Sequence, residues 1–537
     1  MKELMKKFLL SLAMLIPSIV MAHDATAVIT FDQEQVGQSA RLGLVANGDY
    51  KVDWGDGQLV EYSGGAYRTE TVKGTTMKLY GDFIQIVANN VNITDVNFDG
   101  CPNMVQLQLN NNKFKTLNVS HMTAMTGLYA EGGSIQTLDV AGCKSLRVLD
   151  VSENQITGSV DCSAMTNLSK IDLGDNRITE VKLPKQEVLT GLDVRNNQLT
   201  TLDLAGLPKL EEIDAQGNRL TSLDLTGLDA LTELYVYENE LTAINVAPAT
   251  NLVTLSAADN KIASIDLSKN TKLEGVHLTN NELTEIDLTA NTAVRYLNIG
   301  GNHLQTLNVL PLTNLSRLTA ENNRLSSIDL TGKGSLYTLY LDHNDLTSLD
   351  LSGAPRVYDL NVGFNELDAI DLSKHNIYYL QVNDNHLKSI DLSASSYLYR
   401  LAVENNELTA LDITGKNYLQ SLTMHHNKLD ADMVNTIIAN LPDVTNVSVS
   451  DYNRDWAKVF SFDKYENTQV QDAINKGWNT IPYETTAINA VDGEARVVAT
   501  RCYAVNGTLL RDEPQSGVFV RMQVMSDGTT VTTKVAK

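Results

Sequence analysis

Apolar and polar positions alternate in short stretches that return about every 21 residues between residues 91 and 430. In one such unit, valine and leucine alternate with polar residues over positions 276–279, and further apolar residues stand at 283, 286 and 288. Alternation with a period of two predicts a short strand with one buried face. A fixed period over most of a chain predicts a solenoid of stacked coils rather than a globule.

An asparagine follows each predicted strand at a fixed offset, and glycine replaces it once, at position 133. Because an unsatisfied buried polar group costs about 1–3 kcal/mol, we expect the asparagine amide to hydrogen-bond the backbone of the turn. A degenerate unit that contains Ile86 and Ile93 precedes the regular ones. The aligned positions are Asn112, Gly133, Asn154, Asn176, Asn197, Asn218, Asn239, Asn260, Asn281, Asn302, Asn323, Asn344, Asn365, Asn385, Asn406 and Asn427.

Beyond the asparagine, an aspartate or asparagine recurs between two apolar residues, which predicts extended chain with the polar group outside. Examples are Asp203, Asp224, Asp266, Asp287, Asp329, Asp350, Asp371 and Asp412.

Together these residues resemble the leucine-rich repeat, most closely the short-repeat, internalin-like proteins of bacterial surfaces. The resemblance implies a mainly β, curved solenoid of about 17 repeats over residues 86–430, with a parallel sheet on its concave face. At ~4.8 Å per strand, the sheet is on the order of 80 Å long. A unit of 21 residues leaves no room for a full helix, so we expect extended segments or 3₁₀ turns on the convex side. Small β-sandwich-like modules are expected at both ends.

Residues 1–22 have the composition of a secretory signal peptide. Lys2, Lys6 and Lys7 precede an apolar run from Phe8 to Met21, which is too short for a comfortable membrane span. No other stretch is long and apolar enough to cross a bilayer. We therefore expect an exported protein that is secreted or held at the cell surface, on the outer membrane.

The chain carries a formal charge of −23, which becomes about −25 without the net +2 of residues 1–22. Such a surface makes nucleic acid a poor partner. An acidic excess usually serves solubility, and the alternative is that it attracts cationic partners.

Four cysteines are few for an exported chain of this size. Cys101 and Cys143 share an offset two units apart, which is about 10 Å by strand spacing and too far for a disulfide. Cys143 and Cys162 could meet, but small buried thiols are the simpler interpretation.

Residues 23–85 are expected to form a β module that caps the first coils. The segment Val52-Asp53-Trp54-Gly55-Asp56-Gly57 resembles the turn of polycystic-kidney-disease-type and related Ig-like modules. Asp53 and Asp56 could be a metal or catalytic pair, but a tight turn explains both, because Asp and Gly are the residues that such a turn requires.

The predicted C-terminal cap covers residues 431–482 and begins with an amphipathic helix over 431–441. Residues 486–537 form a further β module, with turns at Asn506-Gly507 and Asp527-Gly528 and a last strand that ends at Lys537. This order resembles the C-terminal sorting domain of type IX secretion, although Phe519 stands where tyrosine is commoner. A plain Ig-like adhesin module would use the same turns. The sorting resemblance implies passage across the outer membrane, after which this tail is removed.

No catalytic constellation, metal-ligand spacing or phosphate loop is present, so we expect neither an enzyme nor a cofactor. His425 and His426 are adjacent and point to opposite faces of a strand, which makes them poor joint ligands.

The outward positions of the concave strands vary between units and are the candidates for ligand contact. We define two groups there. The acidic strip consists of Tyr129, Asp150, Asp172, Asp193, Asp214, Glu212, Glu233, Tyr235 and Tyr237. The second patch, described as aromatic and basic, consists of Tyr296, Arg317, Tyr340, Phe364, Tyr379 and Arg400.

A purely structural interpretation of these groups has to be set beside the functional one. Neighbouring aspartates repel by only about 1 kcal/mol per pair in water, and the return path carries a similar column. Lys170 and Arg195 partly neutralise the strip, and tyrosine is a good strand former.

The leading expectation is a non-enzymatic adhesion or binding protein that presents a rigid concave surface to a protein or peptide partner, on a host or neighbouring cell. A preformed surface loses little entropy on binding. The alternative is a surface glycan-binding or matrix-building protein, in which tyrosines stack on sugars and acidic ladders bind cations.

Overall fold

The computed structural model describes residues 24–448 and 457–483 with their side chains, and the backbone of residues 484, 497–504, 509–510, 518–525 and 530–536. The chain divides into two compact units, Met1–Tyr483 and Glu484–Lys537. The predicted signal peptide over residues 1–22 lies outside the described part.

The first unit begins with two small antiparallel sheets and a short 3₁₀ helix, η1 (Gln33–Gln35). One sheet has the order β4 (Leu59–Tyr62), β3 (Tyr50–Asp53), β6 (Thr76–Tyr80), β1 (Ala27–Phe31) and β8 (Ile93–Asn97). In the other, β2 (Ser39–Ala46) pairs with β5 (Ala66–Thr71) and β7 (Phe83–Val87). The apolar alternation of β1 and β2 buries Ile29 and Leu42, which pack in one core with Trp54.

The contacts of Asp53 are those of a turn. One carboxylate oxygen of Asp53 accepts the backbone N–H groups of Gly55 and Gly57, each at 2.9 Å. Asp56 accepts the N–H of Gln58 and pairs with Lys73 at 2.8 Å. Both carboxylates are therefore engaged in closing the hairpin.

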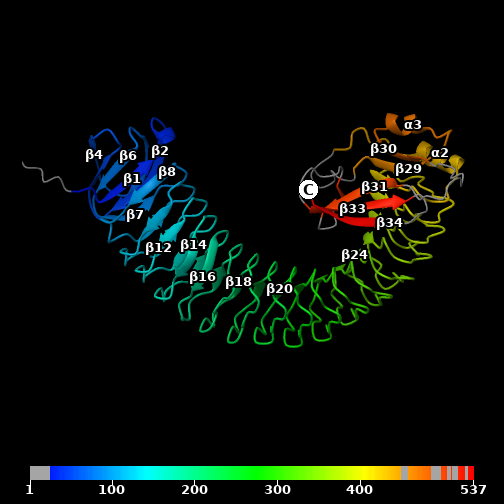
Figure 1. Ribbon diagram of the computed structural model, residues 1–537, viewed down its shortest axis with the longest axis horizontal. Coiled ribbons are helices and arrows are strands. Elements are labelled where there is room, and N and C mark those ends of the chain that lie inside the picture. Colours follow the sequence, from blue (N-terminus) through cyan, green and yellow to red (C-terminus); the bar gives the residue numbers. More distant parts are fainter. Residues whose placement is uncertain are drawn as a thin grey trace, which may run out of the picture. The chain divides into compact units, whose positions relative to one another are not determined.

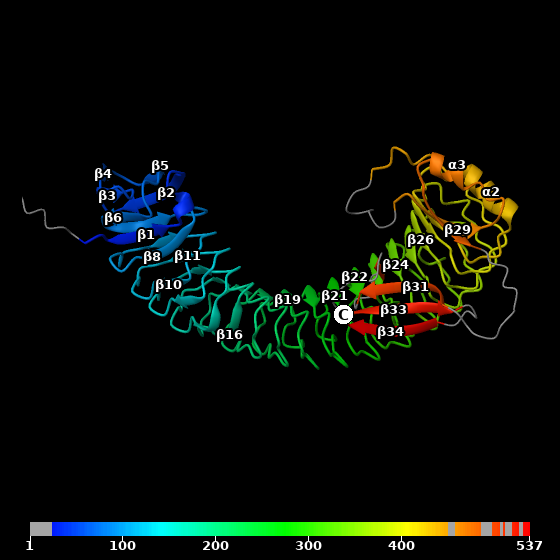
Figure 2. The same ribbon diagram turned by 45° about the horizontal axis from the view of Figure 1, so that its top comes forward.

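The predicted parallel sheet and the mainly β solenoid are confirmed. β7 pairs in parallel with β9 (Gln106–Gln108), so that the sheet of the N-terminal module continues into the coils. Figures 1 and 2 show the coils of this unit following one another along an arc, with the parallel strands on its inner side. The strands that follow β9 in the sheet are β11 (Gly127–Tyr129), β13 (Val148–Asp150), β15 (Lys170–Asp172), β17 (Gly191–Asp193), β18 (Glu212–Asp214), β19 (Glu233–Tyr235), β20 (Thr254–Ser256), β21 (Gly275–His277), β22 (Tyr296–Asn298), β23 (Arg317–Thr319), β24 (Thr338–Tyr340), β25 (Asp359–Asn361), β26 (Tyr379–Gln381), β27 (Arg400–Ala402) and β28 (Ser421–Thr423).

The middle residue of each short strand points into the core, as Leu255, Val276 and Leu297 do with no exposed surface. The residues on either side of it face outward on the concave surface. This is the alternation expected from the sequence.

The predicted hydrogen bonds from the recurring asparagines to the backbone are also confirmed, and we call these asparagines the asparagine ladder. The amide nitrogen of Asn281 donates to the carbonyl oxygens of Ala257, Leu278 and Thr279 at 2.9, 3.1 and 3.4 Å. Its oxygen accepts the N–H of Ile262 at 2.9 Å. Because Ala257 and Ile262 belong to the preceding coil, each ladder amide joins two coils as well as closing its own turn.

The residue before the ladder asparagine adopts a left-handed backbone conformation in most coils. Examples are Asp259 (φ 51°), Asn280 (φ 54°) and Phe364 (φ 54°). The turn therefore places this side chain beyond the end of the strand, outside the columns of the concave strands.

On the return path, short parallel strands pair β10 (Thr116–Asn118) with β12 (Thr137–Asp139), and β14 (Thr157–Asp161) with β16 (Arg177–Lys182). Elsewhere the described return path consists of turns and extended chain, as expected. The convex aspartates cap their own turns, as when Asp266 accepts the N–H of Ser268 at 2.8 Å.

Cys101, Cys143 and Cys162 are buried and unbonded, which confirms the simpler interpretation. Burial raises the pKa of each thiol to about 12, so all three remain protonated. The fourth cysteine lies in the second unit.

The end of the first unit contains the predicted helix, α2 (Ala431–Asn440), whose first turn is capped by the side chain of Asp430. β29 (Val459–Lys464) then pairs in parallel with β28 and continues the sheet beyond the repeats. α3 (Val470–Asn475) and β30 (Asn479–Glu484) follow. Asp463 on β29 accepts the N–H groups of His426 and Asn427, at 3.0 and 3.3 Å, in the last asparagine turn.

In the second unit, β32 (Leu509–Leu510), β31 (Val497–Ala504), β33 (Val518–Met525) and β34 (Thr530–Ala536) form an antiparallel sheet in that order. The predicted turns at Asn506-Gly507 and Asp527-Gly528 lie outside the described residues. No helix among the described residues is long and apolar enough to cross a membrane.

Candidate binding surfaces

The structure brings the aspartates of the acidic strip together on neighbouring strands. Asp150, Asp172, Asp193 and Asp214 occupy the same register position on β13, β15, β17 and β18. At the two ends of the row, the register partners are Tyr129 on β11 and Tyr235 on β19. The carboxylates therefore form a continuous row at strand spacing, ~4.8 Å from one to the next.

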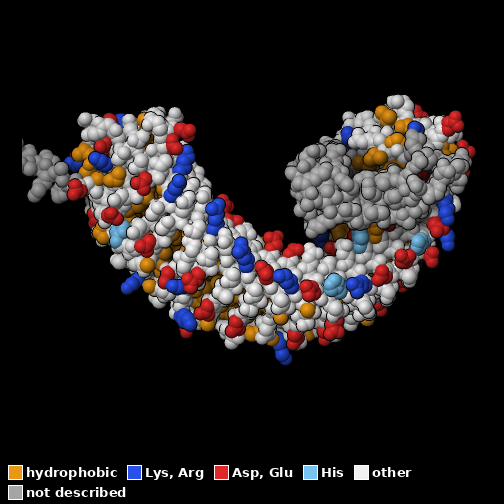
Figure 3. Space-filling view, viewed as in Figure 1, with side chains coloured by type: hydrophobic (Ala, Val, Ile, Leu, Met, Phe, Trp, Pro, Cys, Tyr) orange, Lys and Arg blue, Asp and Glu red, His pale blue; other side chains and the backbone are white. Residues whose placement is uncertain are grey.

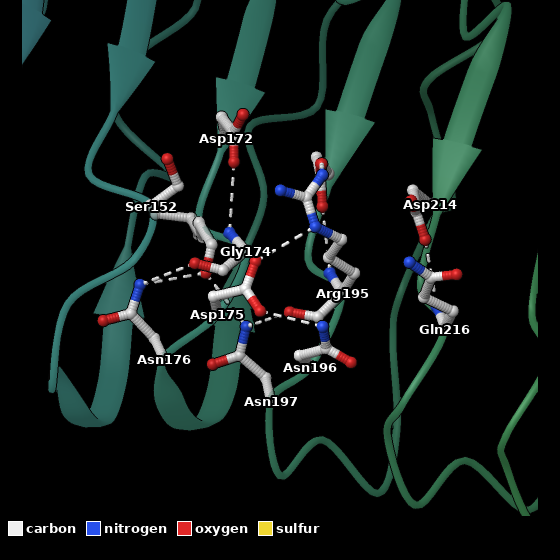
Figure 4. A network of polar contacts seen from close by, with 12 residues as sticks. Ser152, Asp172, Gly174, Asp175, Asn176, Arg195, Asn196, Asn197, Asp214 and Gln216 are labelled. Carbon is white, nitrogen blue, oxygen red and sulfur yellow. Dashed lines mark hydrogen bonds and ion pairs between the residues drawn. The ribbon is translucent and has the colours of Figure 1, made fainter. Parts of the chain in front are cut away.

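Each of these aspartates also has a structural role, because it accepts the backbone N–H two residues further on. The distances are 3.1 Å from Asp172 to Gly174, 3.0 Å from Asp193 to Arg195 and 3.2 Å from Asp214 to Gln216. Figure 4 shows these bonds at the ends of the strands. The bonds fix one carboxylate oxygen and hold the row in a common orientation.

Arg195 lies within the strip and neutralises part of it. Its guanidinium contacts the carboxylates of Asp193 and Asp175, the latter at 3.1 Å (Figure 4). Burial raises the pKa of Asp172, and Lys170, at the other outward position of β15, partly offsets that rise. Arg195 and Lys170 therefore reduce the negative charge of the strip without cancelling it, since the row has four aspartates.

The electrostatics of the row are dominated by burial. Partial burial, together with the neighbouring Asp172 and Asp214, raises the pKa of Asp193 to about 7, and Arg195 only partly offsets this. Burial also raises the pKa values of Asp172 and Asp214. Ionised carboxylates in this row are costly, and a cation placed beside them lowers that cost.

A hollow of about 570 Å³ lies at the end of the strip. Glu212, Asp214, Tyr235 and Tyr237 contribute to its lining, and Glu233 accepts a hydrogen bond of 2.7 Å from the hydroxyl of Tyr235. All nine residues of the strip lie on the concave strands from β11 to β19 or directly after one of these strands. Acidic and phenolic groups share this hollow, which suits a ligand with both a cationic and an apolar part.

Three further residues belong to this surface and were not anticipated. Glu131 follows β11, and burial together with Asp150 raises its pKa. Gln216 and His277 line the hollow. Glu131 and Gln216 occupy the outward position two residues beyond the aspartate column, so extending the alternation past each strand would have found them.

The second patch is assembled only in part, and acidic residues lie beside its arginines. Tyr340 donates a hydrogen bond of 2.8 Å to Asp359, and the guanidinium of Arg317 lies 5.9 Å from the ring centre of Tyr340. Tyr379 on β26 has Asp359 and Arg400 as its register partners. Asp359 interacts electrostatically with both arginines and Glu404 also does so with Arg400, so two carboxyl groups face the two guanidinium groups. Tyr296 lies at an outward position on β22.

Phe364 is the exception in the second patch. Its left-handed backbone places it in the asparagine turn, where its ring stacks on His343 with centroids 4.1 Å apart. Phe364 therefore lies outside the strand columns. The sequence prediction misplaced it because its position along the chain does not reveal the left-handed turn.

Comparison with known proteins bears on the fold. Residues 144–185 match the family described as leucine rich repeats in two copies. The functional domain of InlJ from Listeria monocytogenes aligns at 21% identity over 87% of this chain and 93% of its own, with a TM-score of 0.54. This chain has the fold of a leucine-rich repeat solenoid.

Two further neighbours of this leucine-rich repeat solenoid come from distant sources. A leucine-rich repeat protein of Leptospira interrogans aligns at 22% identity over 64% of this chain and 90% of its own, with a TM-score of 0.52. The plant peptide hormone receptor RGFR1, in complex with RGF2, aligns at 20% identity over 72% of this chain and 65% of its own, with a TM-score of 0.54. No curated protein matches the sequence. Identities this low show the fold alone.

A leucine-rich repeat solenoid is typically a non-enzymatic scaffold for protein interaction. Within the described residues, no group of three or more His, Cys, Asp or Glu side chains could hold a metal ion. On the face in Figure 3, acidic and basic side chains are interspersed along the coils of the first unit. The continuous row of aspartates on the concave sheet therefore stands out as a local concentration of one charge.

Proposed function

We propose that this protein is an exported, non-enzymatic adhesion or binding protein whose concave sheet holds a cationic segment of a protein or peptide along the acidic strip. The observation that carries the proposal is the row from Asp150 to Asp214, which backbone hydrogen bonds orient. Burial raises the pKa of three of its members, Asp172, Asp193 and Asp214. A lysine or arginine side chain beside the row offsets the cost of ionising these partly buried carboxylates.

The tyrosines at the ends of the row supply the apolar part of the contact. Tyr and Arg are enriched among the residues that carry binding energy at interfaces, and both occur here. Tyr235 and Tyr237 flank Asp214 in the hollow, so a side chain with a long apolar stem and a cationic head can meet both kinds of group. In RGFR1, a solenoid of this fold is described with a peptide hormone, which is consistent with peptide binding here.

The proposal is tested with two triple variants that each replace three aspartates, on opposite faces of the solenoid. The concave variant is Asp172→Asn, Asp193→Asn and Asp214→Asn, and the convex control is Asp266→Asn, Asp287→Asn and Asp329→Asn. Asparagine can still accept the N–H two residues further on, so both variants are expected to fold.

Binding of a fluorescent ten-residue lysine-rich peptide is measured at low salt and at physiological salt. At about 1 kcal/mol per close charge pair, the concave variant should bind roughly tenfold to hundredfold more weakly at low salt, and the convex control should match the wild type. Equal losses in the two variants would indicate general charge attraction. Unchanged affinity in the concave variant would remove the strip as the site.

Export and surface location form the second part of the proposal. They rest on residues 1–22 and on the resemblance of residues 486–537 to a sorting tail. Intact mass spectrometry of the protein recovered outside its cell of origin should show an N-terminus near His23. A retained Met1 in that fraction would contradict cleavage.

A further inference from the structure

Six tyrosines gather on one flank of the coils that carry β24 to β28, outside both groups described above. Four precede successive strands by one residue, and two stand a further two residues back along the chain. We call them the tyrosine ladder. Its members are Tyr337, Tyr358, Tyr378, Tyr399, Tyr397 and Tyr418.

The rings of the ladder contact one another from coil to coil. Centroids are 5.7 Å apart between Tyr337 and Tyr358, and 5.3 Å apart between Tyr358 and Tyr378. From Tyr378 the row continues through Tyr397 at 5.9 Å to Tyr418 at a further 5.1 Å. These separations lie in the range of favourable aromatic pairs, so the rings form one continuous surface.

The core does not require these tyrosines. The buried residue of the same segment is its neighbour, such as Leu336 beside Tyr337 or Leu398 beside Tyr397 and Tyr399. In earlier coils, Glu274 and Arg295 occupy the position of Tyr337, which shows that the fold accepts charged residues there. Tyr358, Tyr397 and Tyr418 are 37%, 45% and 47% exposed. A row of exposed aromatic rings that packing does not need indicates a contact surface.

A groove of about 430 Å³ runs along the first half of the ladder. Tyr337, Tyr358 and Tyr378 line it together with Ser335, Arg356 and Asn376. Arg356 is the one charged residue among the lining and ladder residues named here, in a chain with 65 acidic and 42 basic residues. The surface therefore offers hydroxyl, amide and aromatic groups with almost no net charge.

We propose that the tyrosine ladder and its groove bind a neutral polysaccharide chain. A sugar ring is about as long as one strand spacing, ~4.8 Å, so a chain of sugars can repeat the same contact on successive coils. The C–H faces of the sugars pack on the rings, and their hydroxyls meet the polar groups of Ser335, Arg356 and Asn376.

Two other ligand classes fit this surface less well. A charged peptide finds few charged partners on the ladder. A proline-rich peptide repeats about every 9 Å, close to two strand spacings, so it would contact only every second ring of the row. The ladder is separate from the acidic strip, so this proposal goes beyond the proposed function and stands or falls independently of it.

The test uses the full chain in native gels that contain a neutral linear glucan, mannan or galactan. The ladder variant is Tyr397→Ala with Tyr418→Ala, which removes two exposed rings. Asn376→Ala, at an exposed groove position, is a second variant that leaves the rings in place. Tyr67→Ala is the matched control, because Tyr67 is 56% exposed in the N-terminal module.

We expect at least one of the neutral polysaccharides to retard the wild type. The double ladder variant should need roughly tenfold more polysaccharide for the same retardation. Asn376→Ala should weaken retardation, whereas Tyr67→Ala and the concave triple variant should leave it unchanged.

Several results would overturn the proposal. These are no retardation by any of the three polysaccharides, equal retardation of the wild type and a folded ladder variant, or a proline-rich peptide that binds the wild type and not the ladder variant. Thermal melting checks that each variant is folded. Should the double variant fail to fold, unchanged retardation of Asn376→Ala would count against the site.

Discussion

Removal of the side-chain amide of a single asparagine in the ladder should destabilise the solenoid far more than the small size of that group suggests. Asn281→Ala deletes the bonds from the amide nitrogen to the carbonyls of Ala257, Leu278 and Thr279, and the bond from Ile262 N–H to the amide oxygen. All three carbonyls keep a second partner. Thr279 also accepts the N–H of Asp259 at 2.8 Å, Leu278 the amide of Asn302 at 3.0 Å and Ala257 the amide of Asn260 at 3.3 Å. Only the buried N–H of Ile262 is left without a partner, at about 1–3 kcal/mol, and the lost bonds to the three carbonyls add about 0.5–1.5 kcal/mol each.

We therefore expect Asn281→Ala to lower the free energy of unfolding by about 3–5 kcal/mol, since water can enter part of the gap left behind. Asn281→Asp should be at least as damaging, because it replaces the donor with an anion that faces three carbonyl oxygens. Urea denaturation followed by circular dichroism measures both variants.

The matched control for this experiment is Glu282→Ala, which changes the next, exposed side chain and should cost less than about 0.5 kcal/mol. If Asn281→Ala unfolds within about 1 kcal/mol of this control, the ladder amides do not hold the coils together. The physical account of the repeat would then be wrong.

Further predictions concern the acidic strip and the C-terminal cap. Asp193 has a folded pKa of about 7 against an ordinary value of 3.8, and a raised carboxyl pKa destabilises the fold at high pH, where the group must ionise. Asp193→Asn should therefore be more stable than the wild type by about 1–3 kcal/mol at pH 8, after loss of the Arg195 contact is allowed for, and the difference should shrink as the pH falls from 7 towards 4. Thermal melts across this range test it, and a variant less stable than the wild type at pH 8 would show that the Arg195 ion pair outweighs burial. Asp463→Ala leaves the N–H groups of His426 and Asn427 without their carboxylate and should cost about 2–4 kcal/mol. Glu466→Ala, at an exposed position nearby, is its control, and equal urea midpoints for the two would contradict a capping role for Asp463.

The sequence was sufficient to predict the architecture because every unit repeats the same constraints. Buried strand residues such as Val276 and the ladder amide of Asn281 recur at fixed offsets, so any one unit predicts the others. β29 was harder to predict. Val459–Lys464 joins the parallel sheet from outside the repeat, and nothing in its local pattern indicates which strand it will pair with.

The binding surfaces were predictable to the extent that they follow strand alternation. The aspartate column was found because it lies within the strands, whereas Phe364 was misplaced because a left-handed turn precedes Asn365. The tyrosine ladder escaped notice for a related reason. Tyr337 and Tyr397 precede their strands by one and three residues, and only the coordinates show that such positions in successive coils share one surface.

The most direct test of a concave binding site for cationic partners is hydrogen–deuterium exchange of the full chain with and without the lysine-rich peptide. The account predicts that the peptide slows exchange in the segments from β13 to β19 and leaves the convex turns around Asp266 and Asp287 unchanged. Protection confined to the convex turns, or spread evenly over the solenoid, would contradict it.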